Sequence, residues 1–278
     1  MPVWRCGEWT MDLSARTAVM GILNVTPDSF SDGGRYNTVE TAAAHALQLQ
    51  REGADILDIG AQSTRPGHTP VSAEEEWARL EPVLEAIREE IHIPISVDTY
   101  YPDVAKRAIR AGAAIINDVS GCVDNGMAAV AAQTGAGLVM MCPGDANVTE
   151  TAADSFAAVR RYFRRALQIA AWAELPYERL CLDPGIGFGK SREDDLALIA
   201  RLPELMSGLP EIAVLIGASR KRVVAACCGD VPSDERLPGT LALHTVAQWN
   251  GAHVLRVHDV APAVQAVRVT DALRAARG

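Results

Sequence analysis

IPISVDTYYPDVAKRAIRAGAAIINDV, residues 93–119, contains the pattern that decides the fold. An apolar run centred on Ile93–Val97 is followed by a helix-forming segment that stops at Gly112, and a second apolar run covers Ala114–Asn117. Gly112 suits a helix end, because glycine accepts the left-handed conformation that often follows the last helical residue. Two apolar runs joined by one helix predict a strand–helix–strand unit with parallel strands.

The same unit repeats along the whole chain. The expected strands centre on Val19–Leu23, Ile56–Ile59, Ile93–Val97, Ala114–Asn117, Gly137–Met141, Leu180–Asp183, Val214–Gly217 and His253–Val257. Eight such units within about 250 residues favour the α/β class and a closed (β/α)8 TIM barrel. The spacing alone leaves an open doubly wound sheet as the competing architecture. No linker divides the chain, so we expect residues 1–278 to form a single domain with a short N-terminal extension, residues 1–16.

Composition and charge narrow the classes of function. Hydrophobic residues make up 49% of the 278, and 35 acidic residues against 26 basic ones give a formal net charge of −9. Proteins that attract nucleic acid by bulk electrostatics are usually basic, so we expect no nucleic-acid partner. The first twelve residues carry Glu8 and Asp12 where a signal peptide would be apolar, and the six cysteines show no Cys-x-x-Cys spacing. We therefore expect a cytoplasmic protein without a membrane segment.

Polar residues stand at the carboxyl ends of the expected strands, which is the ligand-binding edge of both α/β architectures. They are Asn24, Asp58, Asp98, Asn117, Asp183, Ser219, Arg256 and His258. A single Asp at such a position is commonly a helix N-cap. Asp98, Asn117 and Asp183 at one mouth favour binding instead. A carboxylate can accept paired N–H bonds from an aminopyrimidinone edge, and an amide can both donate and accept.

Two long loops and a run of cations add to this edge. Residues 20–34, MGILNVTPDSFSDGG, and residues 58–67, DIGAQSTRPG, each lead from a strand into a polar loop, and long loops in compact domains are usually functional. Asn24 offers the kind of neutral oxygen that Mg²⁺ accepts when phosphate supplies most of the charge. Three consecutive cations, Arg220–Arg222, stand where a strand turns into a helix. Because a helix begins at its positive end, an anion there is expected, although a solvated charge run is the alternative.

Taken in order, these motifs resemble the dihydropteroate synthase family. The motifs are MGILNVTPDSFSDGG, STRPG, SVDT, INDVSG, DPGIGFGK, SRK and RVHDV, and they extend from Met20 to Val260. The resemblance implies a (β/α)8 barrel that condenses 6-hydroxymethyl-7,8-dihydropterin diphosphate with p-aminobenzoate to 7,8-dihydropteroate and diphosphate. It also implies Mg²⁺-assisted, SN1-like loss of diphosphate, a p-aminobenzoate site of the kind that sulfonamides target, and a homodimer.

The resemblance further implies roles for individual residues. The pterin site would comprise Asp98, Asn117, Met140, Asp183, Phe188, Gly217 and Lys221. The p-aminobenzoate site would comprise Phe30, Thr64, Pro66 and Ser219. The diphosphate site would comprise Asn24, Arg65, Arg256 and His258, with Asn24 also ligating Mg²⁺. Asp32, Arg65 and Lys221 would be catalytic, Asp32 by stabilising a pterin-methyl cation.

Two stretches depart from the family pattern, and three other functions compete. Gly60-Ala61-Gln62 stands where the family usually has Gly-Gly-Glu, and Met141-Cys142 where a Met-His pair is usual. A pterin-binding methyltransferase domain would use the same polar strand ends but would not need a cationic diphosphate site. The other two alternatives are a non-catalytic pterin-binding paralogue and a Schiff-base aldolase that uses Lys221.

Overall fold

The computed structural model describes residues 2–25, 35–62, 70–122, 126–144 and 155–277. Eight parallel strands close a barrel in chain order, and the last strand, β10, pairs with the first, β3. The strands are β3 (Ala18–Asn24), β4 (Ile56–Gly60), β5 (Ile95–Asp98), β6 (Ile115–Asp118), β7 (Gly137–Met141), β8 (Leu180–Asp183), β9 (Ala213–Ile216) and β10 (Val254–Val257). The expected (β/α)8 barrel is confirmed, and the open sheet is excluded.

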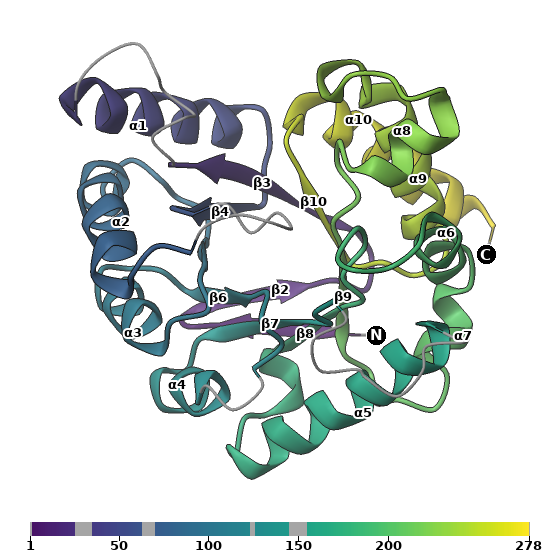
Figure 1. The fold of residues 1–278 in the computed structure, drawn as a ribbon, viewed down its shortest axis with the longest axis horizontal. Coiled ribbons are helices and arrows are strands. Elements are labelled where there is room, and N and C mark those ends of the chain that lie inside the picture. The colour runs from purple at the N-terminus through teal and green to yellow at the C-terminus, as the bar shows by residue number, and fades with distance from the viewer. Residues whose placement is uncertain (1, 26–34, 63–69, 123–125, 145–154, 278) are drawn as a thin grey trace.

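Helices surround the strands on the outside (Figure 1). They are α1 (Arg35–Arg51), α2 (Ala73–Ile87), α3 (Pro102–Arg110), α4 (Met127–Thr134), α5 (Ser155–Trp172), α6 (Arg192–Ala200), α7 (Leu202–Met206), α8 (Arg222–Cys228), α9 (Leu237–Trp249) and α10 (Val260–Ala276). Local signals in the sequence set their ends. The Ser72 side chain accepts the Glu75 N–H at the start of α2, and Gly112 follows α3 with a φ of 110°.

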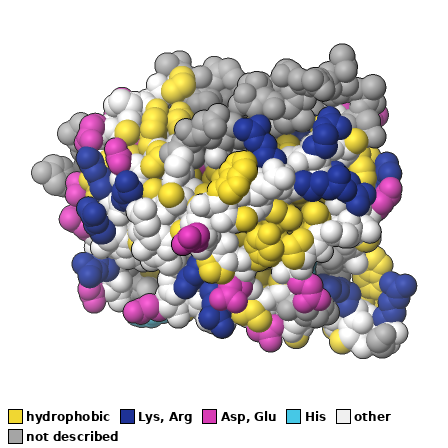
Figure 2. Space-filling model, turned by 90° about the horizontal axis from the view of Figure 1, so that it is seen from below, with side chains coloured by type: hydrophobic (Ala, Val, Ile, Leu, Met, Phe, Trp, Pro, Cys, Tyr) yellow, Lys and Arg dark blue, Asp and Glu magenta, His cyan; other side chains and the backbone are white. Residues whose placement is uncertain are grey.

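Alternating side chains of the strands form two layers. Outward-facing residues such as Leu57, Ile59 and Val97 pack against the helices, and inward-facing residues fill the barrel. On the face that carries α4 and α5, acidic, basic and hydrophobic side chains are mixed (Figure 2). None of the helices in the described part of the chain has the length and apolarity that crossing a bilayer would require.

An N-terminal hairpin closes the amino end of the barrel. Strands β1 (Val3–Cys6) and β2 (Trp9–Asp12) pair antiparallel, and the Trp4 and Cys6 side chains are fully buried against the inner apolar residues. The Trp4 indole donates to the Arg179 carbonyl over 3.1 Å. A Cβ at Gly137 would lie 2.4 Å from the Cys6 sulfur, so β7 needs glycine there. The sequence predicted residues 1–16 only as an extension, without this closure.

Candidate active site

Four strands bring their polar ends together around one buried carboxylate. Asp58 on β4 has no exposed surface. Its Oδ1 accepts the Ser96 hydroxyl over 2.5 Å, and its Oδ2 accepts the Asn117 amide over 3.2 Å and Arg256 Nε over 2.7 Å. The Arg256 guanidinium continues to Asp98 Oδ2 over 2.9 Å. The carboxyl end of the barrel is therefore held by a connected network of charged hydrogen bonds.

Asp98 keeps one free acceptor in this network. Its Oδ1 is buried and has no hydrogen-bond partner among the described residues. Burial raises the pKa of Asp98 well above its ordinary value, against the opposing effect of Arg256, and the nearby Asp58, Glu76 and Asp118 carboxyls raise it further. A buried acceptor at a barrel mouth is what the N–H group of a ligand would satisfy.

Asp183 lies across the mouth at the end of β8. Its Oδ1 accepts the Gly185 N–H over 2.7 Å, which leaves its other oxygen for a second donor. Burial raises the pKa of Asp183, and the nearby Lys221 ammonium opposes that shift. The structure thus holds two buried carboxyls, Asp98 and Asp183, as acceptors at the same end of the barrel.

Lys221 approaches Asp183 over the loop that follows β8. Its Nζ donates to the Ile186 carbonyl over 2.5 Å and lies 4.5 Å from the centre of the Phe188 ring. Lys190 shapes this loop by donating to the Phe188 carbonyl over 3.1 Å. Burial lowers the pKa of Lys221 to about 8, although Asp183 favours its charged form. The amine is therefore a hydrogen-bond donor whose charge depends on pH near neutrality.

The loops after β9 and β10 meet beside Lys221. Ser219 Oγ accepts the His258 backbone N–H over 3.2 Å and lies 3.0 Å from His258 Nδ1. Gly217 faces two cationic side chains, since a Cβ there would lie 3.6 Å from Arg256 Cβ and 3.9 Å from Lys221 Nζ. These contacts bring together Gly217, Ser219, Lys221, Arg256 and His258, as the sequence analysis expected of this end of the barrel.

The three consecutive cations separate in the structure. The Arg220 guanidinium pairs with the Asp259 carboxylate over 2.9 and 2.5 Å. Arg222 is exposed at the first residue of α8. Of the three, Lys221 alone contacts the loop that borders Asp183, so it is the member of the run that belongs to the site.

Met140 does not face the interior of the barrel. It pairs in register with Leu182, and both belong to the outer apolar cluster that packs against the helices. Met141 pairs with Asp183 and therefore shares its inward face, because successive strand residues point to opposite sides. This register contradicts a place for Met140 at the mouth and puts Met141, which is 2% exposed, on the inward face instead.

Asn24 ends β3 with an exposed side chain, near enough to β4 that a Cβ at Gly60 would lie 3.8 Å from its Oδ1. Throughout the described ranges, no group of three or more His, Cys, Asp or Glu side chains is placed to hold a metal ion.

The remaining predicted residues fall outside the described residues. They are Phe30, Asp32, Thr64, Arg65 and Pro66.

Two buried acids near the mouth, Asp58 and Glu76, were not predicted to bind a ligand. Asp58 carried a usable signal, since it stood among the polar strand ends. Glu76 carried none, because it lies in the acidic start of α2, a pattern typical of an exposed helix turn. It is fully buried, accepts the Thr99 hydroxyl over 2.9 Å, and burial raises its pKa to about 7. Beside Glu76 and Thr99, Gln62 accepts the Tyr100 hydroxyl over 3.0 Å.

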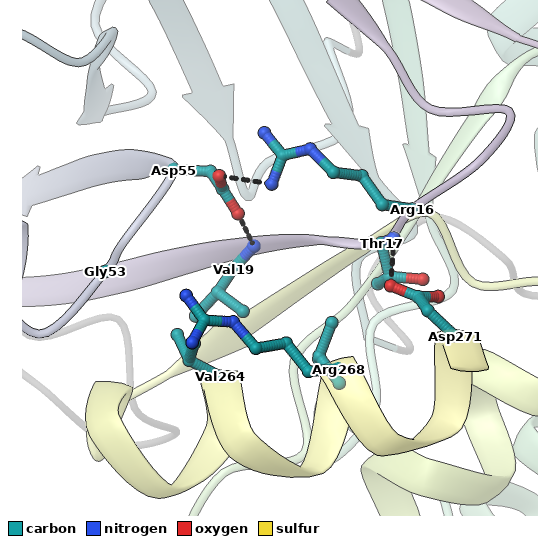
Figure 3. Close-up of a pocket in the computed structure, with 9 residues that line it drawn as sticks. Arg16, Thr17, Val19, Gly53, Asp55, Val264, Arg268 and Asp271 are labelled. Carbon is teal, nitrogen blue, oxygen red and sulfur yellow. Dashed lines mark hydrogen bonds and ion pairs between the residues drawn. The ribbon is translucent and has the colours of Figure 1, made fainter. Parts of the chain in front are cut away.

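A cavity of about 260 Å³ lies away from the mouth, between the start of β3 and α10 (Figure 3). Its acids already have partners: Asp55 pairs with Arg16 over 2.6 Å and accepts the Val19 N–H, and Asp271 accepts the Thr17 N–H. It sits at the amino end of a strand, whereas active sites of such barrels form at the carboxyl ends. The candidate active site is therefore the mouth.

Comparison with known proteins identifies the family of the chain. Residues 20–258 match the family described as "Pterin binding enzyme". The chain is 43% identical over 273 residues to dihydropteroate synthase of Escherichia coli (strain K12), covering 96% of this chain and 95% of that protein. It is 42% identical over 260 residues to the Bacillus subtilis (strain 168) enzyme of the same name, covering 93% and 89%.

Solved structures of dihydropteroate synthases are also similar to this chain. Xanthomonas albilineans dihydropteroate synthase with 4-aminobenzoic acid superposes with a TM-score of 0.91 at 43% identity, covering 99% of this chain and 98% of that one. Dihydropteroate synthase from the same organism in complex with 7,8-dihydropteroate has a TM-score of 0.87 at 37% identity, covering 99% of both chains. A polar mouth on a (β/α)8 barrel, together with this similarity along nearly its whole length, makes the chain an enzyme of the dihydropteroate synthase family.

Proposed function

We propose that this enzyme condenses 6-hydroxymethyl-7,8-dihydropterin diphosphate with p-aminobenzoate, giving 7,8-dihydropteroate and diphosphate. The observation that carries the proposal is the pair of buried acceptors, Asp98 and Asp183, facing a cluster of cations at one end of the barrel. The related structures that contain 4-aminobenzoic acid and 7,8-dihydropteroate support the same pair of ligands.

The pterin ring is bound by its hydrogen-bonding edge. Asp98 Oδ1 and the second oxygen of Asp183 accept N–H groups of the aminopyrimidinone, and the Asn117 amide can donate and accept. A buried carboxylate binds these N–H groups more strongly than a neutral acceptor would, because water does not compete for its oxygens. Phe188, which lies against Lys221, and Met141, which pairs with Asp183, would contact the ring.

The diphosphate is bound by the cations. A guanidinium has five N–H donors, and the contacts of Arg256 with Asp58 and Asp98 use Nε and one terminal N–H. The remaining N–H groups of Arg256, together with the His258 side chain, would bind phosphate oxygens. The family resemblance assigns Arg65 and Asn24 to the diphosphate as well. It assigns Phe30, Thr64, Pro66 and Ser219 to p-aminobenzoate, and Asp32 to stabilising the developing cation.

The reaction requires charge stabilisation more than a nucleophile on the protein. The bond between the pterin methylene carbon and the diphosphate oxygen breaks, and its electron pair leaves with diphosphate. The arylamine nitrogen then forms the new C–N bond and loses a proton. Lys221, Arg256 and His258 stabilise the charge that develops on the leaving group, in positions fixed before the reaction begins.

A magnesium ion fits the residues at the mouth. Asn24 presents an exposed neutral oxygen at the end of β3, and the described residues offer no carboxylate cage. Mg²⁺ that takes most of its ligands from phosphate and water matches such a site. When bound, it would add positive charge to the leaving diphosphate.

The enzyme is proposed to work as a cytoplasmic homodimer. Val246 and Trp249 on α9 are 46% and 42% exposed, and Val269 and Leu273 on the neighbouring α10 are 61% and 56% exposed. An apolar surface shared by two adjacent helices favours contact with a second copy. All six cysteines are free, as in proteins of reducing compartments.

Diphosphate release from the pterin substrate, measured with and without p-aminobenzoate, tests the proposal. We expect dihydropteroate and diphosphate in equal amounts, and no turnover after chelation of Mg²⁺ while pterin itself still binds. A methyltransferase domain or a non-catalytic paralogue would bind pterin without releasing diphosphate. Borohydride trapping of a substrate adduct on Lys221 would instead support the aldolase.

A further inference from the structure

We infer that Arg220 is a positioning residue, whose left-handed backbone and ion pair with Asp259 hold Ser219 and Lys221 in register with His258 at the mouth. The inference rests on the proposed roles of Ser219 and Lys221. It assigns Arg220 no contact with substrate, although it lies between two site residues in the sequence.

The backbone at Arg220 is in an uncommon conformation. Its φ is 56°, in the left-handed region that side chains other than glycine rarely adopt. Such a residue persists only where the surrounding structure determines it strongly, and these positions cluster at functional sites. The conformation therefore needs identifiable contacts that hold it.

Those contacts come from one face of α9 and the residue before it. The Arg220 N–H donates to Thr240 Oγ1 over 3.1 Å, and the Arg220 carbonyl accepts from Arg236 over 2.9 Å. One turn further along, His244 Nε2 accepts the Ala218 N–H over 3.1 Å. Arg236, Thr240 and His244 are spaced four residues apart, so the two contacts from α9 lie on one side of the helix.

The two α9 side chains are buried, and each presents an acceptor to the backbone N–H that it contacts. Thr240 and His244 are each 2% exposed. Burial lowers the pKa of His244 to about 3, so its ring is neutral and Nε2 can accept the hydrogen bond of the Ala218 N–H. Both donors of the turn, the N–H groups of Ala218 and Arg220, are thus satisfied from one rigid helix.

The Arg220 side chain ties this turn to the next strand end. Its guanidinium binds Asp259 through two N–H groups, and the Asp259 carboxylate directly follows His258. Ser219 makes a parallel link, because its hydroxyl contacts the His258 backbone and ring. Two adjacent residues of the β9 loop therefore hold two adjacent residues of the β10 loop, beside the packed helices α8, α9 and α10 (Figure 1).

The ion pair also separates the charges of the cation run. The Arg220 charge is paired with Asp259, whereas the charged form of Lys221 is favoured by the nearby Asp183. If Arg220 were a substrate ligand, losing Asp259 would free it for binding. If it positions Ser219 and His258, losing Asp259 harms the site in the same way as losing Arg220.

Steady-state kinetics of full-length Arg220→Ala, Arg220→Gly and Asp259→Asn test the inference, with Arg222→Ala as the matched control that removes an exposed cation from the same run. Arg220→Ala and Asp259→Asn are expected to raise KM for p-aminobenzoate by about tenfold or more. They should change the Kd of 6-hydroxymethylpterin less than about threefold, because Asp98, Asn117 and Asp183 come from other strands. Arg222→Ala should leave both constants within about twofold.

Arg220→Gly provides the specific readout. Glycine adopts the left-handed conformation freely, so the KM of this variant for p-aminobenzoate should rise less than that of Arg220→Ala, although both lack the guanidinium. Equal KM values for the two variants, an unchanged KM in Asp259→Asn, or equal losses of pterin and p-aminobenzoate binding would each overturn the inference. A wild-type enzyme that forms no dihydropteroate would instead overturn the proposed function.

Discussion

The two ends of the barrel are built from the same strands but have opposite interiors. At the amino end, inward residues such as Met20, Ile56 and Val139 pack with Trp4 of the N-terminal hairpin into an apolar cluster. At the carboxyl end, inward residues are charged or polar and hydrogen-bonded to one another. On β4 the change occurs between Ile56 and Asp58, two residues or about 7 Å apart, and both are fully buried.

Along each strand, the amino end therefore contributes mainly to stability and the carboxyl end mainly to function. Burial of apolar surface at the amino end stabilises the fold by roughly 25 cal/mol per Å². Burial of carboxyls at the mouth costs free energy, as their raised pKa values show, and is offset only in part by the cations beside them. Substitutions at the two ends should therefore affect different measurements.

The largest expected effect is on stability, from Trp4→Ala at the amino end. Removing a fully buried indole leaves a cavity under the barrel and should lower the free energy of unfolding by about 3–5 kcal/mol. Urea denaturation measures this loss. The Kd of a pterin analogue, measured by calorimetry on the folded variant, should stay within about twofold of wild type. A matching loss of pterin affinity would show that the two ends are not independent.

The next effect is on binding, from Asp183→Asn at the mouth. The amide replaces an acceptor with a donor, which should weaken pterin binding about ten- to a hundredfold, or roughly 1.5–3 kcal/mol. The free energy of unfolding should not fall. Since burial raises the Asp183 pKa, the folded protein is favoured while the group is protonated, and this contribution is lost as pH rises through the raised pKa.

Asp55→Asn is the matched control for that substitution. Asp55 lies at the amino end and pairs with an Arg16 side chain that is 60% exposed, so its loss should change stability by only about 0–1 kcal/mol and pterin affinity not at all. Unchanged pterin affinity in Asp183→Asn would return that residue to a helix-capping role.

The carboxyl end was more predictable from sequence than the amino end. Polar residues at strand ends interrupt apolar runs, so Asp98, Asn117 and Asp183 were visible without a structure. The hairpin was not, because a short strand in which Trp4 and Cys6 alternate with the exposed Val3 and Arg5 looks like any surface segment until the barrel supplies its partner.

Two misses at the mouth have physical causes. Met140 and Met141 are adjacent and equally apolar, and only the register with β8 decides which one faces inward. Glu76 was hidden because burial comes from the packing of α2 over Thr99, a contact between residues far apart in the sequence. Periodicity locates a strand end, but the partner of a buried acid is a property of the assembled fold.

The smallest effect, a pH dependence, sharpens the comparison at Lys221. Burial lowers the pKa of Lys221 from 10.5 to about 8, so the amine is charged below that pH and loses its proton above it. Since the charged form donates to substrate oxygens, kcat/KM should fall by about tenfold per pH unit above the pKa. Bound diphosphate favours the ammonium, so the fall in kcat should lie at higher pH than the fall in kcat/KM.

Lys221→Arg keeps its proton throughout and should lose this alkaline fall, while Trp4→Ala, at the other end of the barrel, should keep the wild-type profile. A wild-type kcat/KM that stays flat well above the Lys221 pKa would remove Lys221 from the reaction and leave it as part of the loop after β8.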